Sequence, residues 1–218
     1  MRTEPLGDRG VQVVLGTTPD DETRLSIAAA AERLHRAGIP GLMDCVPGFT
    51  TLTVLFDPLH ALTATAAVRE ALGPPLRIEE AGQPATVDVL VHYGGEHGPD
   101  LEALAGALGM TTDEVVRRHA AGEYRVHMIG FVPGFPYLTG LDPTLAAPRL
   151  ANPRKRVPAG SVAIGGSHAG VYPIDSPGGW HLLGWTSLPL FDPKLDPPVL
   201  LRPGDRVRFR PASIARAT

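Results

Sequence analysis

Apolar and polar positions along the first third of the chain form a succession of strand-like and helix-like patterns. Three short apolar runs suit strands: 11–15, 42–46 and 52–56. Two segments carry apolar residues at helical spacing: 20–36 and 59–72. Two later strand candidates follow the breaker Gly73-Pro74-Pro75: Ile78 and 86–92. The resulting order, β-α-β-β-α-β, predicts a small ferredoxin-like α/β sandwich.

The pattern changes near residue 83, so we expect an N-terminal α+β domain over 1–82 and a second domain over 83–218. Two short helices are predicted early in the second domain. The first covers 101–108, and the second begins where Thr111 and Glu114 fit a capping box. The chain as a whole is therefore expected to be of the α+β class.

From Tyr124 onward the pattern is that of β structure and loops. Glycine and proline crowd into 131–205, where they separate short apolar runs as turn-rich β structure requires. In the last run, 206–210, Val207 and Phe209 alternate with arginines. This alternation predicts a strand with one buried face and one wet face.

Amino-acid composition and net charge exclude several classes of function. The 218 residues are 43% apolar and 20% charged, as is ordinary for a globular protein. The formal charge of −3 argues against general binding to nucleic acid or to a membrane surface. Cys45 is the only cysteine, so no intramolecular disulfide can form. Residues 1–10 lack the apolar core of a secretory signal, and we expect a cytoplasmic protein.

Two motifs suggest chemistry that their surroundings do not support. The glycine-rich run 165–170 is followed by Val171-Tyr172 where a phosphate loop needs Lys-Ser/Thr, so it is interpreted as a tight turn, which could still line a pocket. Asp175, Ser176 and His181 invite a hydrolase triad, but the Gly-x-Ser-x-Gly elbow is absent. The pair Ser176-Pro177 indicates a turn instead.

The helices and histidines also have plain structural interpretations. The two helices within 101–119 resemble a helix-turn-helix, but in an acidic chain a packed helical hairpin is the better prediction. The eight histidines show no His-Glu-x-x-His spacing, so no metal site is predicted. His119 closes a helix, where a partly cationic ring would favour the C-terminal dipole. Cys45 lies in an apolar run and is expected to be a core thiol.

The richest stretch for binding is 130–138, where aromatic rings alternate with glycine and proline. Such a rigid segment can wall a pocket with little entropy left to lose on binding. Downstream, cations stand beside prolines at Arg149, Arg154 and Arg156. A guanidinium held by rigid backbone can clamp a carboxylate or a phosphate in bidentate fashion.

Nine segments together resemble the family of KipI and the 5-oxoprolinase B subunits, whose shared domain is also called allophanate hydrolase subunit 1. They are 91–101 (VHYGGEHGPDL), 130–138 (GFVPGFPYL), 148–150 (PRL), 153–154 (PR), 157–164 (VPAGSVAI), 170–173 (GVYP), 176–180 (SPGGW), 190–193 (LFDP) and 203–207 (PGDRV). The N-terminal region matches more loosely, so the resemblance spans nearly the whole chain.

The resemblance implies a cyclophilin-like β-barrel over 83–218, preceded by a KipI N-terminal-like domain. It also implies two partners, an allophanate hydrolase subunit 2-type barrel subunit and a LamB/YcsF-type subunit. Together they would open 5-oxo-L-proline to L-glutamate with ATP and Mg²⁺, and this chain would be inactive alone. No biotin-carrier Met-Lys-Met segment is present in the sequence.

On this hypothesis Arg149, Arg154 and Arg156 are catalytic candidates that anchor a carboxylate or a phosphoryl group. The substrate-binding candidates are Phe131, Pro133, Gly134, Phe135, Tyr137, Gly165, Gly166, His168, Tyr172, Ser176, Gly178, Gly179 and Trp180. The alternative function is that of a KipI-type inhibitor of a sensor histidine kinase, which needs no catalysis. Prolyl isomerase activity is a weaker alternative, since it rests on fold analogy.

Overall fold

The computed structural model of the protein describes residues 1–73, 76 and 83–215. Contacts divide the chain into two compact units, 1–83 and 84–218, which are described separately. The sequence-based boundary stood between residues 82 and 83. Within the described residues, no helix is both long enough and apolar enough to cross a lipid bilayer.

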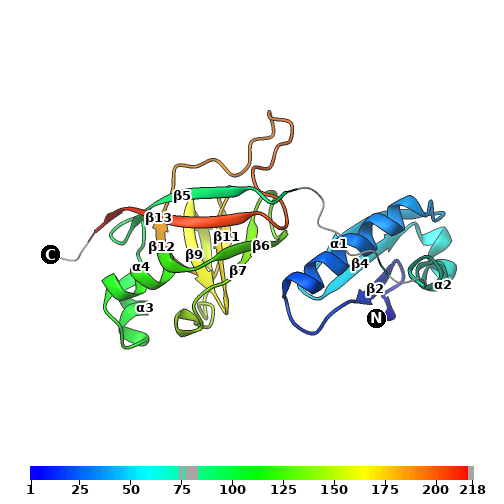
Figure 1. The fold of residues 1–218 in the computed structure, drawn as a ribbon, viewed down its shortest axis with the longest axis horizontal. Helices are drawn as coiled ribbons and strands as arrows, with labels where there is room; N and C mark the ends of the chain where they lie inside the picture. Colours follow the sequence, from blue (N-terminus) through cyan, green and yellow to red (C-terminus); the bar gives the residue numbers. More distant parts are fainter. Residues whose placement is uncertain (74–75, 77–82, 216–218) are drawn as a thin grey trace. The chain divides into compact units, whose positions relative to one another are not determined.

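The first unit is a four-stranded antiparallel sheet with two helices. Its strands, in the order β1-β2-β4-β3, are β1 (Arg2–Leu6), β2 (Gly10–Val14), β4 (Thr51–Phe56) and β3 (Leu42–Pro47). Helix α1 (Asp21–Arg36) contacts β3 and β4, and α2 (Ala61–Leu72), which follows a 3-10 turn at Pro58–His60, contacts β1 and β2. Both helices can be followed in Figure 1.

Local sequence accounts for α1. Asp20 caps its N-terminus by accepting a hydrogen bond of 2.8 Å from the backbone N–H of Thr23. Its apolar residues Ile27, Ala30 and Leu34 are at most 3% exposed and pack on the sheet. Cys45 belongs to the same core, as predicted, and burial raises the pKa of its thiol to about 11.

One strand of this unit was not predicted. β1 pairs with β2 and occupies the edge of the sheet next to it. The strand expected at Ile78 lies outside the described residues. The order from β2 to α2 agrees with the predicted β-α-β-β-α, and the ferredoxin-like class of this unit stays a prediction.

The second unit is built on a closed seven-stranded barrel with the strand order β10-β7-β6-β13-β5-β12-β9. The strands are β5 (Thr86–Tyr93), β6 (Tyr124–Ile129), β7 (Pro136–Thr139), β9 (Ser161–Gly165), β10 (His168–Val171), β12 (His181–Trp185) and β13 (Arg206–Ile214). β13 runs parallel to β5, and the other neighbours in the barrel are antiparallel. Figure 1 shows β5 and β13 side by side.

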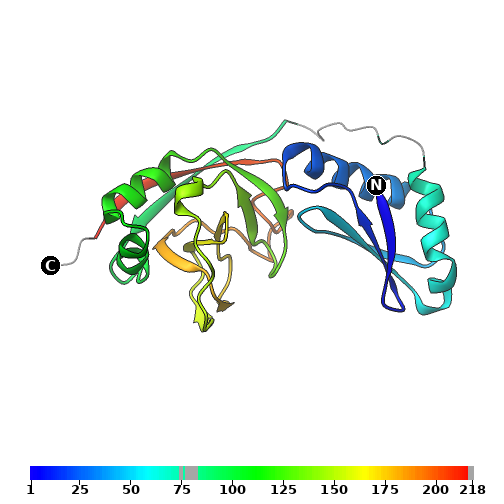
Figure 2. The same ribbon diagram turned by 90° about the horizontal axis from the view of Figure 1, so that it is seen from below.

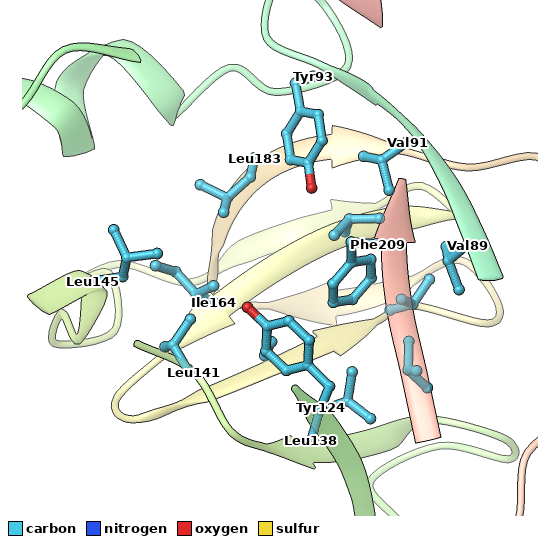
Figure 3. Packing of buried hydrophobic residues seen from close by; sticks show 14 of the residues in the cluster. Val89, Val91, Tyr93, Tyr124, Leu138, Leu141, Leu145, Ile164, Leu183 and Phe209 are labelled. Carbon is cyan, nitrogen blue, oxygen red and sulfur yellow. The ribbon is translucent and has the colours of Figure 1, made fainter. Parts of the chain in front are cut away.

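Aromatic and branched side chains fill the barrel. Tyr93, Tyr124 and Phe209, each at most 2% exposed, point into one interior (Figure 3). Val207 is also buried, whereas the arginines that alternate with it are exposed. The predicted division of the last strand into a buried and a wet face is confirmed.

Two helices lie beside each other at one end of the barrel (Figure 2): α3 (Leu101–Ala107) and α4 (Thr112–Ala121). Thr111 caps α4 by accepting a hydrogen bond of 3.2 Å from the backbone N–H of Glu114. Leu104, Val115 and Val116 are buried in the barrel core, which confirms the packed helical hairpin.

His119 differs from its prediction. Its side chain is fully buried, and burial lowers its pKa to about 3, so the ring is neutral rather than partly cationic. Its Nδ1 atom lies 2.7 Å from the hydroxyl oxygen of Tyr93, and the two groups share a hydrogen bond. The helix-dipole interpretation of His119 is therefore wrong.

A separate two-stranded sheet joins β8 (Arg154–Val157) to β11 (Ser176–Gly178), and a 3-10 turn lies at Pro143–Leu145. Ser176 pairs with Val157, so the turn expected at Ser176-Pro177 is a short strand. The turn expected in 165–170 is present, because Gly166 has φ +61° between β9 and β10.

Candidate functional site

Aromatic rings, glycines and one arginine line a pocket of about 230 Å³ in the second unit. The lining residues are Phe131, Phe135, Tyr137, Arg149, Pro153, Tyr172, Pro177, Gly178, Gly179 and Trp180. The pocket thus brings together two segments that the sequence singled out separately, the run 130–138 and the run 176–180. The two runs are about 40 residues apart in the sequence but line the same pocket.

The rings pack around Phe135, which is 1% exposed. Tyr137, Tyr172 and Trp180 meet it edge to face, with ring centroids 5.0, 5.1 and 5.4 Å away. Phe131 meets it in the same way at 5.6 Å. Edge-to-face pairs of this spacing are favourable and directional, so the wall of the pocket is fixed in place.

Phe131 holds an unfavourable backbone conformation at this pocket. Among the described residues it alone combines a side chain with a positive φ, of 65°, and it is 58% exposed. Three backbone hydrogen bonds hold its loop, the shortest from Val132 N–H to the Gly130 carbonyl at 2.7 Å. Such strain persists where the surroundings impose it and is common at functional sites. The exposed ring is therefore the best candidate for contact with a ligand or a partner.

Two glycines make room for the rings. A Cβ atom on Gly165 would lie 2.7 Å from ring carbons of Trp180, and one on Gly178 would overlap the hydroxyl of Tyr172. Neither contact is tolerable for a carbon atom. The glycines predicted here are needed because of close packing rather than backbone flexibility.

Arg149 supplies the charge at this pocket. Its guanidinium carbon lies 5.7 Å from the centroid of the Trp180 ring, within the range of a cation–π contact. Within the described residues it forms no ion pair, so its charge is available to an anion. Burial raises the pKa values of Tyr137 and Tyr172 while Arg149 opposes the rise, and both hydroxyls stay protonated near neutral pH.

The other two arginine candidates have partners outside the pocket lining. Arg154 donates to Asp100 at 2.5 Å, and the second oxygen of Asp100 accepts from the Leu182 N–H at 2.7 Å. Arg156 is exposed, and its Nε and Nη2 atoms both donate to one oxygen of Asp175, at 2.9 and 2.6 Å. The expected cluster of three arginines is thus divided, and catalytic roles for Arg154 and Arg156 stay predictions.

The hydrolase triad is not formed. Asp175 is engaged by Arg156, and the Nε2 atom of His181 lies 2.8 Å from the carbonyl of Pro148. Ser176 is 7% exposed, and its Oγ has no hydrogen-bond partner within the described residues. Ser176 is therefore buried next to the pocket rather than presented as a nucleophile.

The remaining predicted residues are not part of the pocket lining. Gly134 is buried with φ +81°, where a Cβ would meet Phe191, and Pro133 is exposed in the same loop. Gly166 forms the β9–β10 turn. Burial, then the charges of His127 and Arg149, lower the pKa of His168, so its ring is neutral near pH 7.

Pro153 and Pro177 line the pocket but were not among the predicted site residues. Each stands directly beside a predicted residue, Arg154 or Gly178, which was the available signal. A proline has a fixed φ and keeps such a wall rigid. For metals, the described residues contain no group of three or more His, Cys, Asp or Glu side chains that could hold an ion.

Comparison with known proteins places this barrel and pocket in a class. The family model described as carboxyltransferase domain, subdomain C and D, matches residues 1–201. Two curated relatives are named as the B subunit of 5-oxoprolinase. The protein of Bacillus subtilis (strain 168) is 40% identical over 94% of this chain and 90% of its own, and that of Escherichia coli O157:H7 is 45% identical over 94% of both.

The chain therefore belongs to the family of 5-oxoprolinase B subunits, as its sequence motifs indicated. A crystal structure of the protein TTHA0988 is also similar, with 40% identity and a TM-score of 0.78. The match covers 96% of this chain but only 40% of that one. The two units described here thus correspond to part of a longer polypeptide in TTHA0988.

Proposed function

We propose that the protein is the B subunit of an ATP-dependent 5-oxoprolinase, which opens 5-oxo-L-proline to L-glutamate. The observation that carries this proposal is the identity of 40–45% to proteins named as 5-oxoprolinase B subunits over 94% of the chain. We further propose that the first unit is ferredoxin-like and that the barrel is cyclophilin-like. The cytoplasmic location expected from the sequence is part of the same proposal.

The aromatic pocket suits a small lactam that carries a carboxylate. The exposed ring of Phe131 and the partly exposed ring of Tyr137 offer apolar surface to a flat five-membered ring, and a volume of about 230 Å³ holds one small molecule. Arg149 receives the carboxylate, because it is the cation that lines the pocket without an acidic partner in the described residues. Substrate would thus be oriented by stacking on one side and by charge on the other.

Tyr172 can add a directed hydrogen bond. Its hydroxyl oxygen interacts with the backbone N–H of Trp180, which leaves its own proton to donate into the pocket. A lactam carbonyl is an acceptor for such a donor. The hydroxyl keeps its proton near pH 7 because burial raises its pKa.

The chain is proposed to be inactive alone and to complete its site with other subunits. ATP, when bound, supplies the energy for opening a resonance-stabilised amide, and the described residues offer no carboxylate or histidine cluster for its Mg²⁺. We therefore propose that ATP and Mg²⁺ bind in the assembled complex. The proposed partners are an allophanate hydrolase subunit 2-type barrel subunit and a LamB/YcsF-type subunit, and the longer chain of TTHA0988 supports a partner domain.

The test is ATP hydrolysis that depends on 5-oxoproline, measured with the chain alone and with both partner subunits. Turnover is expected only in the mixture. A stable complex without turnover would redirect the proposal to another amide, and failure to form any complex would favour a kinase inhibitor.

Variants test the site within the active mixture. Arg149→Gln should lower kcat/KM for 5-oxoproline about tenfold or more, the effect of one lost charge-assisted hydrogen bond. Arg202→Gln removes an exposed arginine outside the pocket lining and is the matched control. Equal kinetics for the two variants would remove Arg149 from the site.

A further inference from the structure

A second pocket, of about 530 Å³, lies on the outer wall of the barrel. It is lined by β13, by the first residues of β5 and β6, and by the end of α4, and it shares no lining residue with the aromatic pocket. Four of its lining residues are arginines: Arg125, Arg206, Arg208 and Arg210. In a chain of formal charge −3, this is a local concentration of positive charge.

The strand geometry places these arginines on one face. Val207 and Phe209 point into the barrel, so the alternating residues of β13 point outward. The parallel register sets Asp88 of β5 opposite Arg208. The carboxylate of Asp88 accepts from both Arg208, at 2.8 and 3.0 Å, and Arg210, at 3.0 Å.

One carboxylate therefore serves two guanidinium groups. Hydrogen bonds from Arg208, the largest effect, and from Arg210 lower the pKa of Asp88, which stays ionised near neutral pH. All three side chains are about half exposed. This group keeps a net positive charge and retains guanidinium N–H donors that one carboxylate cannot satisfy.

Arg206 and Arg125 face each other across the antiparallel pair of β13 and β6. Directly opposite residues on neighbouring strands share a face, so both side chains lie on the outer face of the sheet. Within the described residues the side chain of Arg206 forms no hydrogen bond or ion pair. Arg206 therefore leaves an exposed guanidinium on this face that is available to an anionic ligand.

The opposite wall has the complementary chemistry. The last residues of α4 and Gly122 contribute backbone carbonyls, and Glu123 contributes the only carboxylate among the described lining residues. These groups accept hydrogen bonds and would repel an anion. A ligand that fits the whole pocket therefore carries several negative charges at one end and hydrogen-bond donors, such as hydroxyl or amino groups, at the other.

We propose that this pocket binds a phosphate-bearing small molecule, with Arg206 and its neighbours holding the phosphates. Guanidinium groups bind phosphate oxygens in bidentate fashion, and the volume is that of a pocket for a nucleotide-sized ligand. The phosphates can belong to a nucleotide or to a free polyphosphate. This site is additional to the aromatic pocket and does not depend on the proposed lactam reaction.

Isothermal titration calorimetry of the purified full chain tests the proposal with ATP, inorganic triphosphate and adenosine, without metal and at low salt. ATP and triphosphate should bind with dissociation constants below about 1 mM, and adenosine should not bind. Tighter binding of ATP than of triphosphate indicates a nucleotide, and equal binding indicates a free polyphosphate. Added salt should weaken both, because it screens exposed charges.

Two variants locate the site. Arg206→Gln should weaken triphosphate binding about tenfold, as expected for one lost charge-assisted contact. Arg202→Gln removes the same charge four residues away, outside the pocket lining, and should leave affinity unchanged. Both arginines are exposed, so both variants should fold, and circular dichroism checks this.

The proposal is overturned if neither ATP nor triphosphate binds, or if the two variants lose affinity equally. It is also overturned if an oligoglutamate peptide binds while triphosphate does not, because that result indicates an acidic protein partner. These titrations use the chain alone. A negative result in these titrations can therefore be distinguished from a failure to reconstitute 5-oxoprolinase activity.

Discussion

Replacing Gly165 by alanine tests whether close packing fixes the aromatic pocket. The new Cβ would lie 2.7 to 2.8 Å from ring carbons of Trp180, a side chain that is 5% exposed and cannot swing into solvent. Elsewhere a Gly→Ala change stabilises by about 0.4–1 kcal/mol through the unfolded state. Here overpacking should reverse the sign and destabilise the second unit by about 1–3 kcal/mol.

The matched control is Gly106→Ala. Gly106 lies within α3, and a Cβ there would meet nothing within 4 Å. Alanine should therefore stabilise the helix by about 0.5–1 kcal/mol. The two variants make the same chemical change in the same unit, with opposite expected signs.

Urea unfolding followed by tryptophan fluorescence measures both variants. Both tryptophans of the chain, Trp180 and Trp185, lie in the second unit, so the signal reports on that unit. Gly165→Ala should lower the free energy of unfolding and change the native emission of Trp180. If Gly165→Ala were as stable as the wild type, the ring would have room to move, and the rigid wall of the pocket would be refuted.

Three further predictions concern buried polar groups. Arg154→Ala should lower the free energy of unfolding by about 1.5–3 kcal/mol, because it leaves the carboxylate of Asp100, which is 13% exposed, without its cation. The control is Arg156→Ala, which removes an exposed ion pair and should leave the urea midpoint unchanged. Asp205→Asn should cost about 1–3 kcal/mol in thermal unfolding, because Asp205 is 8% exposed and accepts two backbone N–H groups, at 2.8 and 2.9 Å. Burial lowers the pKa of His119 from 6.5 to about 3, so between these values the unfolded chain binds a proton that the folded chain does not. The contribution of His119 to the free energy of unfolding should be fully present above pH 6.5 and should fall with decreasing pH, by up to about 1.4 kcal/mol per pH unit. In urea titrations at several pH values, His119→Phe should remove this dependence. An unaltered slope in that variant would contradict the assignment to His119.

Much of the fold could be predicted because local signals and tertiary packing agree. Asp20 caps α1 as its residue type suggests, and Val207 and Phe209 enter the barrel as their alternation indicates. The two helices of the second unit follow from the capping residue Thr111 and from apolar spacing. Closure of seven strands into a barrel was not derivable from these patterns, because β13 pairs with β5 across about 120 residues.

The features that the sequence did not predict correctly have a common cause, which is contact with segments far away in the chain. β1 is an edge strand whose residues include Pro5 and two charged side chains, so only its pairing with β2 makes it a strand. Ser176-Pro177 has turn chemistry, yet pairing with β8 makes it a strand. His119 has the position of a helix-end cation, but the ring is covered by the barrel core. In each case a distant segment decides the outcome.

The arginines show why the site was harder to predict than the fold. Arg149, Arg154 and Arg156 are neighbours in sequence, which suggested one cationic cluster. Asp100, 54 residues before Arg154, removes that arginine from the pocket lining by an ion pair that sequence spacing does not reveal. What distinguishes Arg149 is therefore the absence of a nearby acid within the described residues, together with the Trp180 ring beneath its guanidinium. A free cation over an aromatic wall is a property of the folded site, and it is this property that makes Arg149→Gln the sharpest test of the proposed substrate carboxylate.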